Sequence, residues 1–246
     1  KEDKVKLAVE MGCVAMSVGI ESGNDAVRRS VQRFYRNDNV VKKLRMCQDY
    51  GIRVSTFNII GFPGETRENV FETIELNRQI GSNAANAYVL YPYHGTPIAI
   101  EQNVPLRDGE GKIPTIDIGH TLGFSEMSAD ELLGLRQTFN HYLMLPKTLY
   151  PIIRLAEAQD AVGNAILNEL TKLTVSMISG TQLKMVPLGE VVNDIPTNPN
   201  WDLSIMVPRL FKQIHSLPIG PEDMLAIGDA LMATYAEEAA KVASAQ

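Results

Sequence analysis

The first hundred residues alternate between two hydrophobic patterns, and these predict strands and helices in turn. Near-continuous apolar runs predict three buried strands at residues 14–20, 54–60 and 87–91. Apolar positions at helical spacing, together with turn residues, predict helices at about 3–11, 38–50 and 66–81. The order is helix, strand, helix, strand, helix, strand.

The ends of these predicted helices carry residues that commonly terminate helices. Glycines, which readily take the left-handed conformation, follow all three helices: Gly12, Gly51 and Gly81. Asn37 or Asp38 is expected to cap the second helix and Thr66 the third, because their side-chain oxygens can accept the unpaired N–H groups of a first turn.

Strands separated by helices pair in parallel through right-handed crossovers, with both faces of the sheet covered. We therefore predict an α/β fold: an incomplete TIM-type (β/α) barrel with parallel strands, followed by a mostly α-helical C-terminal region. Three strands do not close a barrel, which would leave the strand at 14–20 with a bare edge. The chain begins at Lys1 rather than Met, and we expect it to be a fragment whose missing strands precede Lys1.

The C-terminal half has a different character. A stretch at 101–126 is rich in Gly, Pro and Asp and predicts a long loop, acting as a lid or a linker. A capping box at Ser128 begins a helix. Further helices are expected at about 147–158, at 160–179 and from Pro221, with an irregular stretch at 181–201. We divide the chain into a barrel part at 1–126 and a helical region at 127–246.

Composition limits the classes of function. The chain has 246 residues and a net charge of -6, which argues against a general nucleic-acid-binding surface but leaves room for a local basic site. No apolar run reaches the roughly 18–20 residues of a membrane span. Two cysteines, Cys13 and Cys47, are too few for a disulfide scaffold or for a metal cluster built from this chain alone, and they favour a reducing cytoplasm. Both are expected to be core residues.

Each predicted strand is followed directly by glycines and polar residues, at 19–25, 61–66 and 91–97. The carboxyl ends of parallel strands meet at one edge of the sheet, where ligands bind in such folds. Read singly, each segment has an alternative without a ligand: Glu21 could be a solvated carboxylate, 61–65 a simple turn before a helix, and 91–93 a packed strand end. Together they predict one ligand-binding site.

In order and spacing, these three segments resemble the radical S-adenosylmethionine (SAM) superfamily, in particular the branch that often carries an N-terminal cobalamin-binding domain. The segment Gly19–Asp25 looks like the family's fourth-strand motif, and Asn58–Thr66 looks like the fifth. Tyr91–Thr96 is similar to the sixth. The stretch from Val27 to Arg36 resembles the family segment in which an arginine is common, and Arg33 is the best match. The resemblance covers about residues 1–100.

The resemblance implies roles for individual residues. Glu21 would accept hydrogen bonds from the ammonium or ribose hydroxyls of SAM, and Arg33 would pair with its carboxylate in a fork geometry. Ser22 and Asn58 would bond the ribose. The remaining expected contacts are backbone groups around Ile60, Gly61 and Tyr91 beside the adenine, and Tyr93 and His94 on the substrate side. No catalytic residue and no metal ligand is assigned in this chain.

The resemblance also implies partners. A reduced [4Fe-4S] cluster would cleave SAM to a 5′-deoxyadenosyl radical, with ligand cysteines that are not in this chain. Cobalamin, carried by a domain outside the chain, would make a methyltransferase possible. An electron donor such as a flavodoxin or ferredoxin is expected. The sequence departs from the family where Phe57, rather than an acid, precedes Asn58, and where His94 replaces a common proline.

Two other classes of function stay open at this point. An ordinary (β/α)-barrel enzyme, such as an aldolase or isomerase, would need a catalytic lysine or a set of metal ligands at the strand ends. A non-catalytic helical binding module would be dominated by residues 128–246. A Cys-x-x-x-Cys-x-x-Cys segment upstream in the reading frame would favour the radical enzyme over both.

Overall fold

The computed structural model describes residues 2–82, 84–105, 123–145 and 147–180, together with positions 225, 228, 229, 232 and 236. Two compact units divide the chain, Lys1–Phe139 and Asn140–Gln246. The division falls within helix α6 (Ala129–Met144), 13 residues after the boundary at 126/127 proposed from the sequence.

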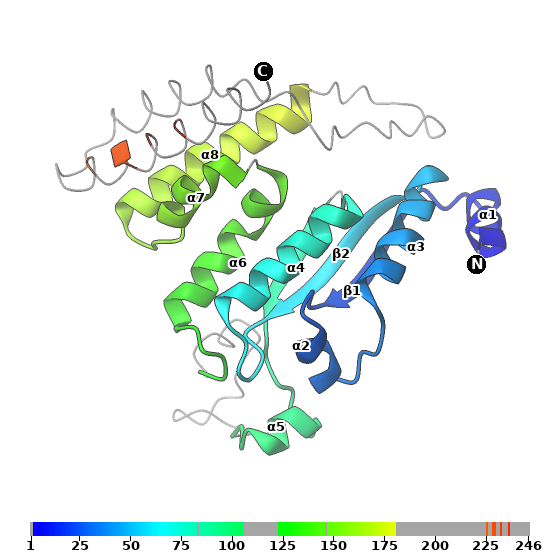
Figure 1. Cartoon of the computed structure of the whole chain (residues 1–246), viewed down its shortest axis with the longest axis horizontal. Helices are drawn as coiled ribbons and strands as arrows, with labels where there is room; N and C mark the ends of the chain where they lie inside the picture. The colour runs from blue at the N-terminus through cyan, green and yellow to red at the C-terminus, as the bar shows by residue number, and fades with distance from the viewer. Residues whose placement is uncertain are drawn as a thin grey trace. The chain divides into compact units, whose positions relative to one another are not determined.

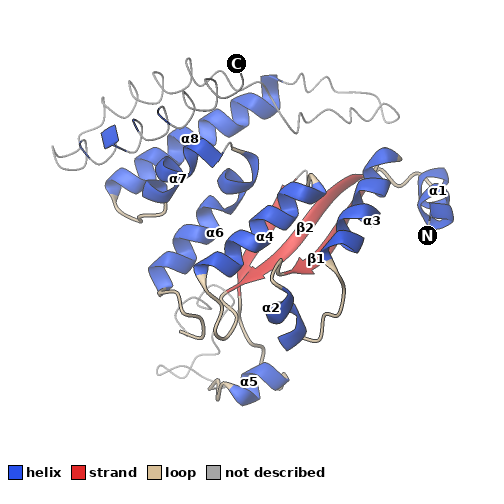
Figure 2. Cartoon of the chain, viewed as in Figure 1, coloured by secondary structure: helices blue, strands red, loops and turns tan. Residues whose placement is uncertain are grey.

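The first unit is built on a parallel sheet with strands in the order β1-β2-β3. The strands are β1 (Ala15–Glu21), β2 (Arg53–Ile60) and β3 (Ala84–Val89). The helices that precede and separate them are α1 (Glu2–Glu10), α3 (Asn37–Asp49) and α4 (Arg67–Ile80). Helices α3 and α4 lie on the same face of the sheet (Figure 1; Figure 2). The predicted α/β architecture, an incomplete barrel followed by helices, is confirmed.

Most of the predicted helix ends are confirmed. The three glycines all have positive φ angles: Gly12 85°, Gly51 82° and Gly81 71°. Thr66 begins α4 with a capping box shared with Asn69. The cap predicted for α3 is wrong, because its N-cap is Arg36, which makes no side-chain capping bond. Asn37 is already helical, and its amide instead donates to the carbonyl of Gly23 at 2.9 Å.

Strand residues alternate between the helix-facing side and the opposite, open face. Ile20 and Val54 pack with Leu44, Cys47 and Leu76 in the core between sheet and helices. Phe57 and Tyr88 are exposed on the open face, with ring centroids 6.2 Å apart. The prediction that both faces are covered is therefore not met within the described residues.

Two short helices and one strand boundary were missed from the sequence. Helix α2 (Asp25–Ser30) begins after Asn24, whose side chain accepts from the Val27 N–H, and α5 (Pro97–Glu101) begins after Thr96. Both contain fewer than two turns, too few for a hydrophobic period to show. Strand β3 starts at Ala84 rather than 87 and pairs with β2 from there.

The helices after residue 127 follow the prediction closely. They are α6, a 3-10 helix η2 (Lys147–Leu149), α7 (Tyr150–Ala156) and α8 (Ala161–Gly180). Ser128 and Glu131 form the expected capping box, with the Glu131 N–H 3.2 Å from the serine Oγ. Within the second unit, the buried Glu157 carboxylate accepts from the Tyr142 hydroxyl at 2.5 Å and pairs with Arg154 at 3.0 Å.

Three predicted segments lie largely or wholly outside the described residues: most of the loop at 101–126, the stretch at 181–201 and the helix from Pro221. Among the helices that the structure describes, none combines the length and apolarity needed to cross a membrane.

Candidate functional site

The carboxyl end of β1 carries an irregularity that controls where Glu21 points. The pairing of β1 with β2 shifts register between Gly19 and Glu21, and Glu21 adopts a left-handed φ of 64°. This turns the carboxylate back over the strand. A Cβ placed on Gly19 would stand 3.0 Å from the Glu21 Oε1 atom. The glycine thus leaves the space that the carboxylate occupies.

Glu21 and Arg33 are the two predicted site residues whose side chains the structure joins directly. The Arg33 guanidinium donates to the Glu21 carboxylate at 3.0 Å. The Glu21 side chain is 15% exposed and that of Arg33 is 56% exposed. A half-exposed cation therefore lies beside a mostly buried anion at the end of the strand.

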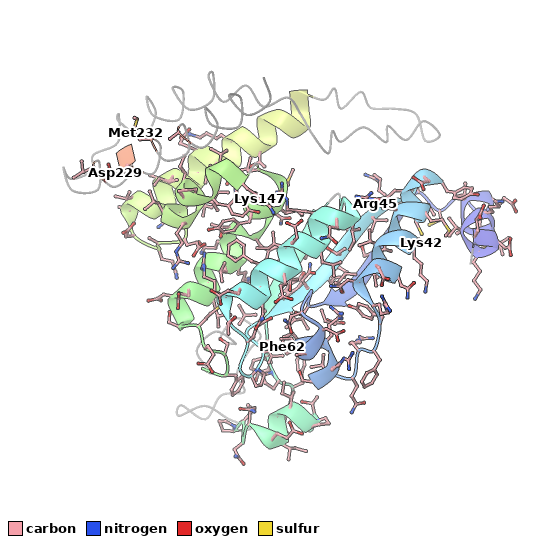
Figure 3. The ribbon with its side chains drawn as sticks, viewed as in Figure 1. Lys42, Arg45, Phe62, Lys147, Asp229 and Met232 are labelled. Atoms are coloured by element: carbon pink, nitrogen blue, oxygen red, sulfur yellow. The ribbon has the colours of Figure 1, made fainter. Side chains whose placement is uncertain are left out.

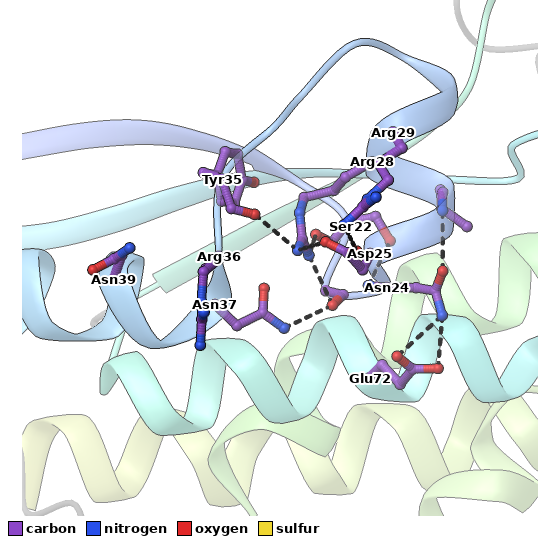
Figure 4. A network of polar contacts seen from close by, with 12 residues as sticks. Ser22, Asn24, Asp25, Arg28, Arg29, Tyr35, Arg36, Asn37, Asn39 and Glu72 are labelled. Atoms are coloured by element: carbon purple, nitrogen blue, oxygen red, sulfur yellow. Dashed lines mark hydrogen bonds and ion pairs between the residues drawn. The ribbon is translucent and has the colours of Figure 1, made fainter.

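Arg28, which was not predicted, holds the connection between β1 and α3 in place. Its buried guanidinium donates to the carbonyls of Ser22 and Gly23 at 2.9 and 2.8 Å, and to Asp25 and the Tyr35 carbonyl at 3.0 and 3.2 Å (Figure 4). It also stacks over the Tyr35 ring, 4.7 Å from the centroid. One arginine thus ties both ends of the segment that carries Arg33.

Tyr35 provides a second anchor for this segment. Its hydroxyl donates to the carbonyl of Ile20, next to Glu21. Burial raises the pKa of Tyr35 to about 12, outweighing the opposite effect of the Arg28 charge. The phenol therefore stays a neutral hydrogen-bond donor at physiological pH, and the position of Arg33 relative to β1 does not depend on its titration.

Ser22 and Asn58, both predicted to bind the ribose, are fully buried on the helix-facing side. The Ser22 hydroxyl lies 3.2 Å from that of Thr73 in α4. Asn58 accepts from the Asn77 amide at 2.9 Å, and the Thr56 hydroxyl donates to Asn77 at 2.5 Å. We call these five side chains the polar seam between the sheet and α4. Their bonding capacity is used within the protein.

The turn after β2 is built around Gly61 and Glu65. Gly61 has a φ of 87°, and a Cβ there would come within 3.3 Å of Leu132 in α6. Its N–H and that of Phe62 donate to the buried Glu65 carboxylate, at 2.6 and 3.2 Å. The carbonyl of Ile60, whose side chain is buried, accepts from the Leu90 N–H. Phe62 itself packs with Val27 and Leu90, close to α2 (Figure 3).

Glu65 is buried with only one of its carboxylate oxygens bonded. Oε2 accepts both turn N–H groups, whereas Oε1 has no hydrogen-bond partner among the described residues. Burial raises the pKa of Glu65 to about 7, although the two backbone hydrogen bonds oppose that shift. The turn is therefore held by a group that titrates near neutral pH.

The turn after β3 places the predicted substrate-side residues near the surface. The Tyr91 and Tyr93 rings meet edge to face with centroids 5.5 Å apart. Tyr93 and His94 are exposed, and the Tyr93 carbonyl accepts from the Thr96 hydroxyl at 2.6 Å. This turn and the two before it follow parallel strands, so all three lie at the same edge of the sheet.

Arg28, Tyr35 and Glu65 were not assigned roles from the sequence. Glu65 stands in a recognised motif, and its spacing of four residues from Gly61 is the only signal that pointed to it. Arg28 shares its short helix with another arginine, so no pattern in the sequence distinguished the buried one from the exposed one.

Metal ligands are not gathered in the part of the chain that the structure describes, where no group of three or more His, Cys, Asp or Glu side chains could hold an ion. Cys47 is buried and Cys13 packs against the same hydrophobic core. Cys47 is a core residue, as predicted, whereas Cys13 is only partly buried, and neither belongs to a group of described side chains that could hold a metal ion.

Comparison with known proteins gives a family. Residues 1–76 match the family model described as the radical SAM superfamily. A tRNA-2-methylthio-N(6)-dimethylallyladenosine synthase of Sulfurihydrogenibium is 30% identical over 102 residues, covering 40% of this chain and 23% of the relative. The synthase of the same name from Thermus thermophilus is 33% identical over 87 residues, covering 35% and 19%.

A third relative extends further along the chain. An uncharacterized methyltransferase of Pyrococcus horikoshii is 28% identical over 152 residues, covering 60% of this chain and 33% of the relative. In these matches the chain spans about a fifth to a third of the relatives' length. The family model, these relatives and the three strand ends agree, and together they support membership of the radical SAM superfamily.

Proposed function

We propose that this chain supplies SAM-binding residues of a radical SAM enzyme, and that Glu21 and Arg33 are the side chains that hold the cofactor. The observation that carries the proposal is the 3.0 Å ion pair at the carboxyl end of β1, formed by two residues twelve positions apart. Membership of the superfamily implies SAM and a [4Fe-4S] cluster as cofactors.

The chemistry of the pair fits the amino-acid end of SAM, which carries an ammonium and a carboxylate. Glu21 offers carboxylate oxygens to the ammonium or to the ribose hydroxyls. The Arg33 guanidinium is planar and presents several donors, which suits a carboxylate better than the single ammonium of a lysine. Because Gly19 has no side chain, the Glu21 carboxylate lies over the strand rather than beside it.

The other two strand ends complete the proposed site with backbone rather than side chains. The peptide groups around Gly61 and Tyr91 would flank the adenine, and the side chain of Ile60 would stay in the core. Ser22 and Asn58 are left out of the proposed contacts, because both side chains are buried and bonded to α4. The exposed Tyr93 and His94 would lie toward the substrate.

The cluster does not fit the described residues, since Cys47 lies in the core, Cys13 packs against that core, and no group of three or more potential ligands is gathered there. Its ligands would come from another part of the protein, as would an electron donor such as a flavodoxin or ferredoxin. SAM bound beside the cluster supplies either hydrogen-atom abstraction or, with cobalamin, methyl transfer. Hydrogen-atom abstraction and cobalamin-assisted methyl transfer are both proposals. The cytoplasmic compartment, expected from the two free thiols, is a proposal as well.

The substrate is also a proposal. The relatives are named for a methylthiolated adenosine of tRNA and for methyl transfer. Of these two descriptions, an RNA substrate is the one that the arginines between residues 28 and 36 favour, because arginine pairs well with phosphate.

The test is the SAM affinity of the full-length protein, measured by isothermal titration calorimetry. We expect Arg33→Ala to weaken binding by about 10- to 100-fold, the usual effect of losing a charged hydrogen bond. Arg33→Lys should recover only part of that loss. Arg53→Ala removes an exposed arginine from the opposite end of β2 and should have no effect. Unchanged affinity in Arg33→Ala would refute the proposal.

A further inference from the structure

The segment that follows β1 is basic within an acidic protein. Residues 28–36 contain four arginines and no acid, whereas the whole chain has a net charge of -6. Arg28 is buried and holds the segment together. The side chains of Arg29 and Arg36 are 66% and 80% exposed. The segment therefore brings four arginines next to the proposed cofactor site, where Glu21, Asp25 and Asp38 pair with them.

The same segment carries an exposed aromatic ring. Phe34 is 78% exposed, although it stands between the anchored residue Tyr35 and the ion-paired Arg33. Its neighbours are fixed by hydrogen bonds, so its exposure is a feature of an ordered loop. A large aromatic ring held in solvent and flanked by arginines is typical of surfaces on which an unpaired base stacks.

Beside the loop is an open hollow of about 510 Å³, lined by Asp25, Arg28, Arg29, Arg36, Asn37 and Asp38. Its two exposed arginines, Arg29 and Arg36, pair with Asp25 at 2.8 Å and with Asp38 at 3.1 Å. Ion pairs this exposed contribute little to stability. Arg36 binds both oxygens of Asp38, and a phosphate group can replace that carboxylate in the same bidentate geometry, whereas Asp25 also pairs with the buried Arg28.

We infer that this surface binds single-stranded RNA, with one base stacked on Phe34 and the backbone phosphates held by Arg29 and Arg36. Stacking requires a base that is already unpaired, which favours a loop or a single strand over a duplex. One part of the inference rests on the proposed function. If Arg33 holds SAM, the nucleotide stacked on the adjacent Phe34 would lie beside the cofactor.

The experiment measures fluorescence anisotropy of the full-length protein with a labelled single-stranded RNA of about 12 nucleotides. We expect Phe34→Ala to weaken binding about tenfold and Phe34→Trp to preserve it, because tryptophan also stacks. The double variant Arg29→Gln with Arg36→Gln should reduce the slope of log affinity against log salt by about 1.4, the value for two phosphate contacts on a single strand. Arg53→Gln, at an exposed position at the other end of β2, is the control for loss of a surface charge.

SAM affinity measured on the same variants separates the two proposals. Phe34→Ala should bind SAM like the wild type, which would show that the fold and the cofactor site are intact. A wild type that binds SAM but no RNA would refute the RNA surface and leave the SAM site standing. The same conclusion would follow if Phe34→Ala and the double arginine variant both bound RNA as tightly as Arg53→Gln does. The RNA surface would also be refuted if a duplex RNA bound as tightly as the single strand and Phe34→Ala did not change the affinity for that duplex.

Discussion

The two faces of the β1-β2-β3 sheet use polar residues in opposite ways. On the helix-facing side, polar side chains bond to one another: Asn77 of α4 links Thr56 and Asn58, and Thr73 meets Ser22. On the open face the strand residues are small or exposed, and the polar groups gather at the strand ends. Polar residues on the first face stabilise the fold, and those at the ends of the second are available to a ligand.

Because of this difference between the two faces, two residues that are adjacent in the sequence have different roles. Glu21 and Ser22 are adjacent, yet the first pairs with Arg33 at the surface and the second is buried against α4. The register shift after Gly19 produces this separation by turning Glu21 away from the helices. A strand-end motif thus identifies a region, whereas the local backbone decides which of its side chains a ligand can reach.

The largest effect on stability is expected from Asn77→Ala. It would leave the buried Thr56 hydroxyl without its acceptor and the buried Asn58 amide oxygen without its donor, at a cost of about 3 to 4 kcal/mol. Urea denaturation measures this. Gln79→Ala, at an exposed position of the same helix, is the control and should change little. Loss of less than about 1 kcal/mol would show that the seam is not what stabilises this face.

The next largest effect on stability is expected from the titration of Glu65, in the turn that follows β2. The pKa of Glu65 is raised from 4.5 to about 7, so the unfolded state releases this proton at lower pH than the folded state does. Stability should therefore fall by about 3 kcal/mol as the pH rises from 4.5 through 7, and then level off. Glu65→Gln, which keeps an acceptor for the two turn N–H groups, should remove that fall.

Thermal melts at several pH values between 4.5 and 8.5 test this, with the exposed Glu10→Gln as control. A fall of equal size in Glu65→Gln would mean that another group is responsible.

A smaller effect is expected from Gly19→Ala on the open face. The new methyl group would crowd the Glu21 carboxylate, which is at the end of a flexible side chain and can shift at a cost on the order of 1 kcal/mol. We expect SAM affinity to fall about fivefold with little change in the melting temperature. A drop in stability without a change in affinity would place Gly19 in the fold rather than in the site.

The smallest effect is expected from Phe57→Ser. Phe57 is exposed and contacts Tyr88 across the open face, so its loss should cost about 0.5 kcal/mol. The midpoint of urea denaturation measures it. A cost comparable to that of Asn77→Ala would mean that the two faces contribute equally, and the contrast between them would fail.

The sequence predicted the elements of this sheet well because hydrophobic period and helix ends are local properties. Gly12, Gly51 and Gly81 each adopt the left-handed conformation expected of them. The sequence could not show that Asn58 faces the helices, since its strand reads as a near-continuous apolar run with no visible alternation. It also could not show that Arg28 is buried and Arg29 exposed, because that depends on the path of a loop.

Residues Glu21 and Arg33 were identified through resemblance to a family rather than through periodicity. Their ion pair depends on a bulge and on the anchoring of a connection by Arg28 and Tyr35. Such features arise from tertiary contacts, which a pattern of hydrophobic positions does not encode. The same holds for Glu65, whose shifted pKa reflects burial that only the folded turn creates.

The most direct test compares two adjacent residues in the full-length protein. SAM dissociation constants are measured for Glu21→Gln and Ser22→Ala, each alongside its melting temperature. We predict that Glu21→Gln weakens SAM binding at least about tenfold with a near-normal melt, and that Ser22→Ala lowers the melting temperature and leaves SAM affinity unchanged. The reverse pattern, with affinity lost in Ser22→Ala and kept in Glu21→Gln, would contradict the account.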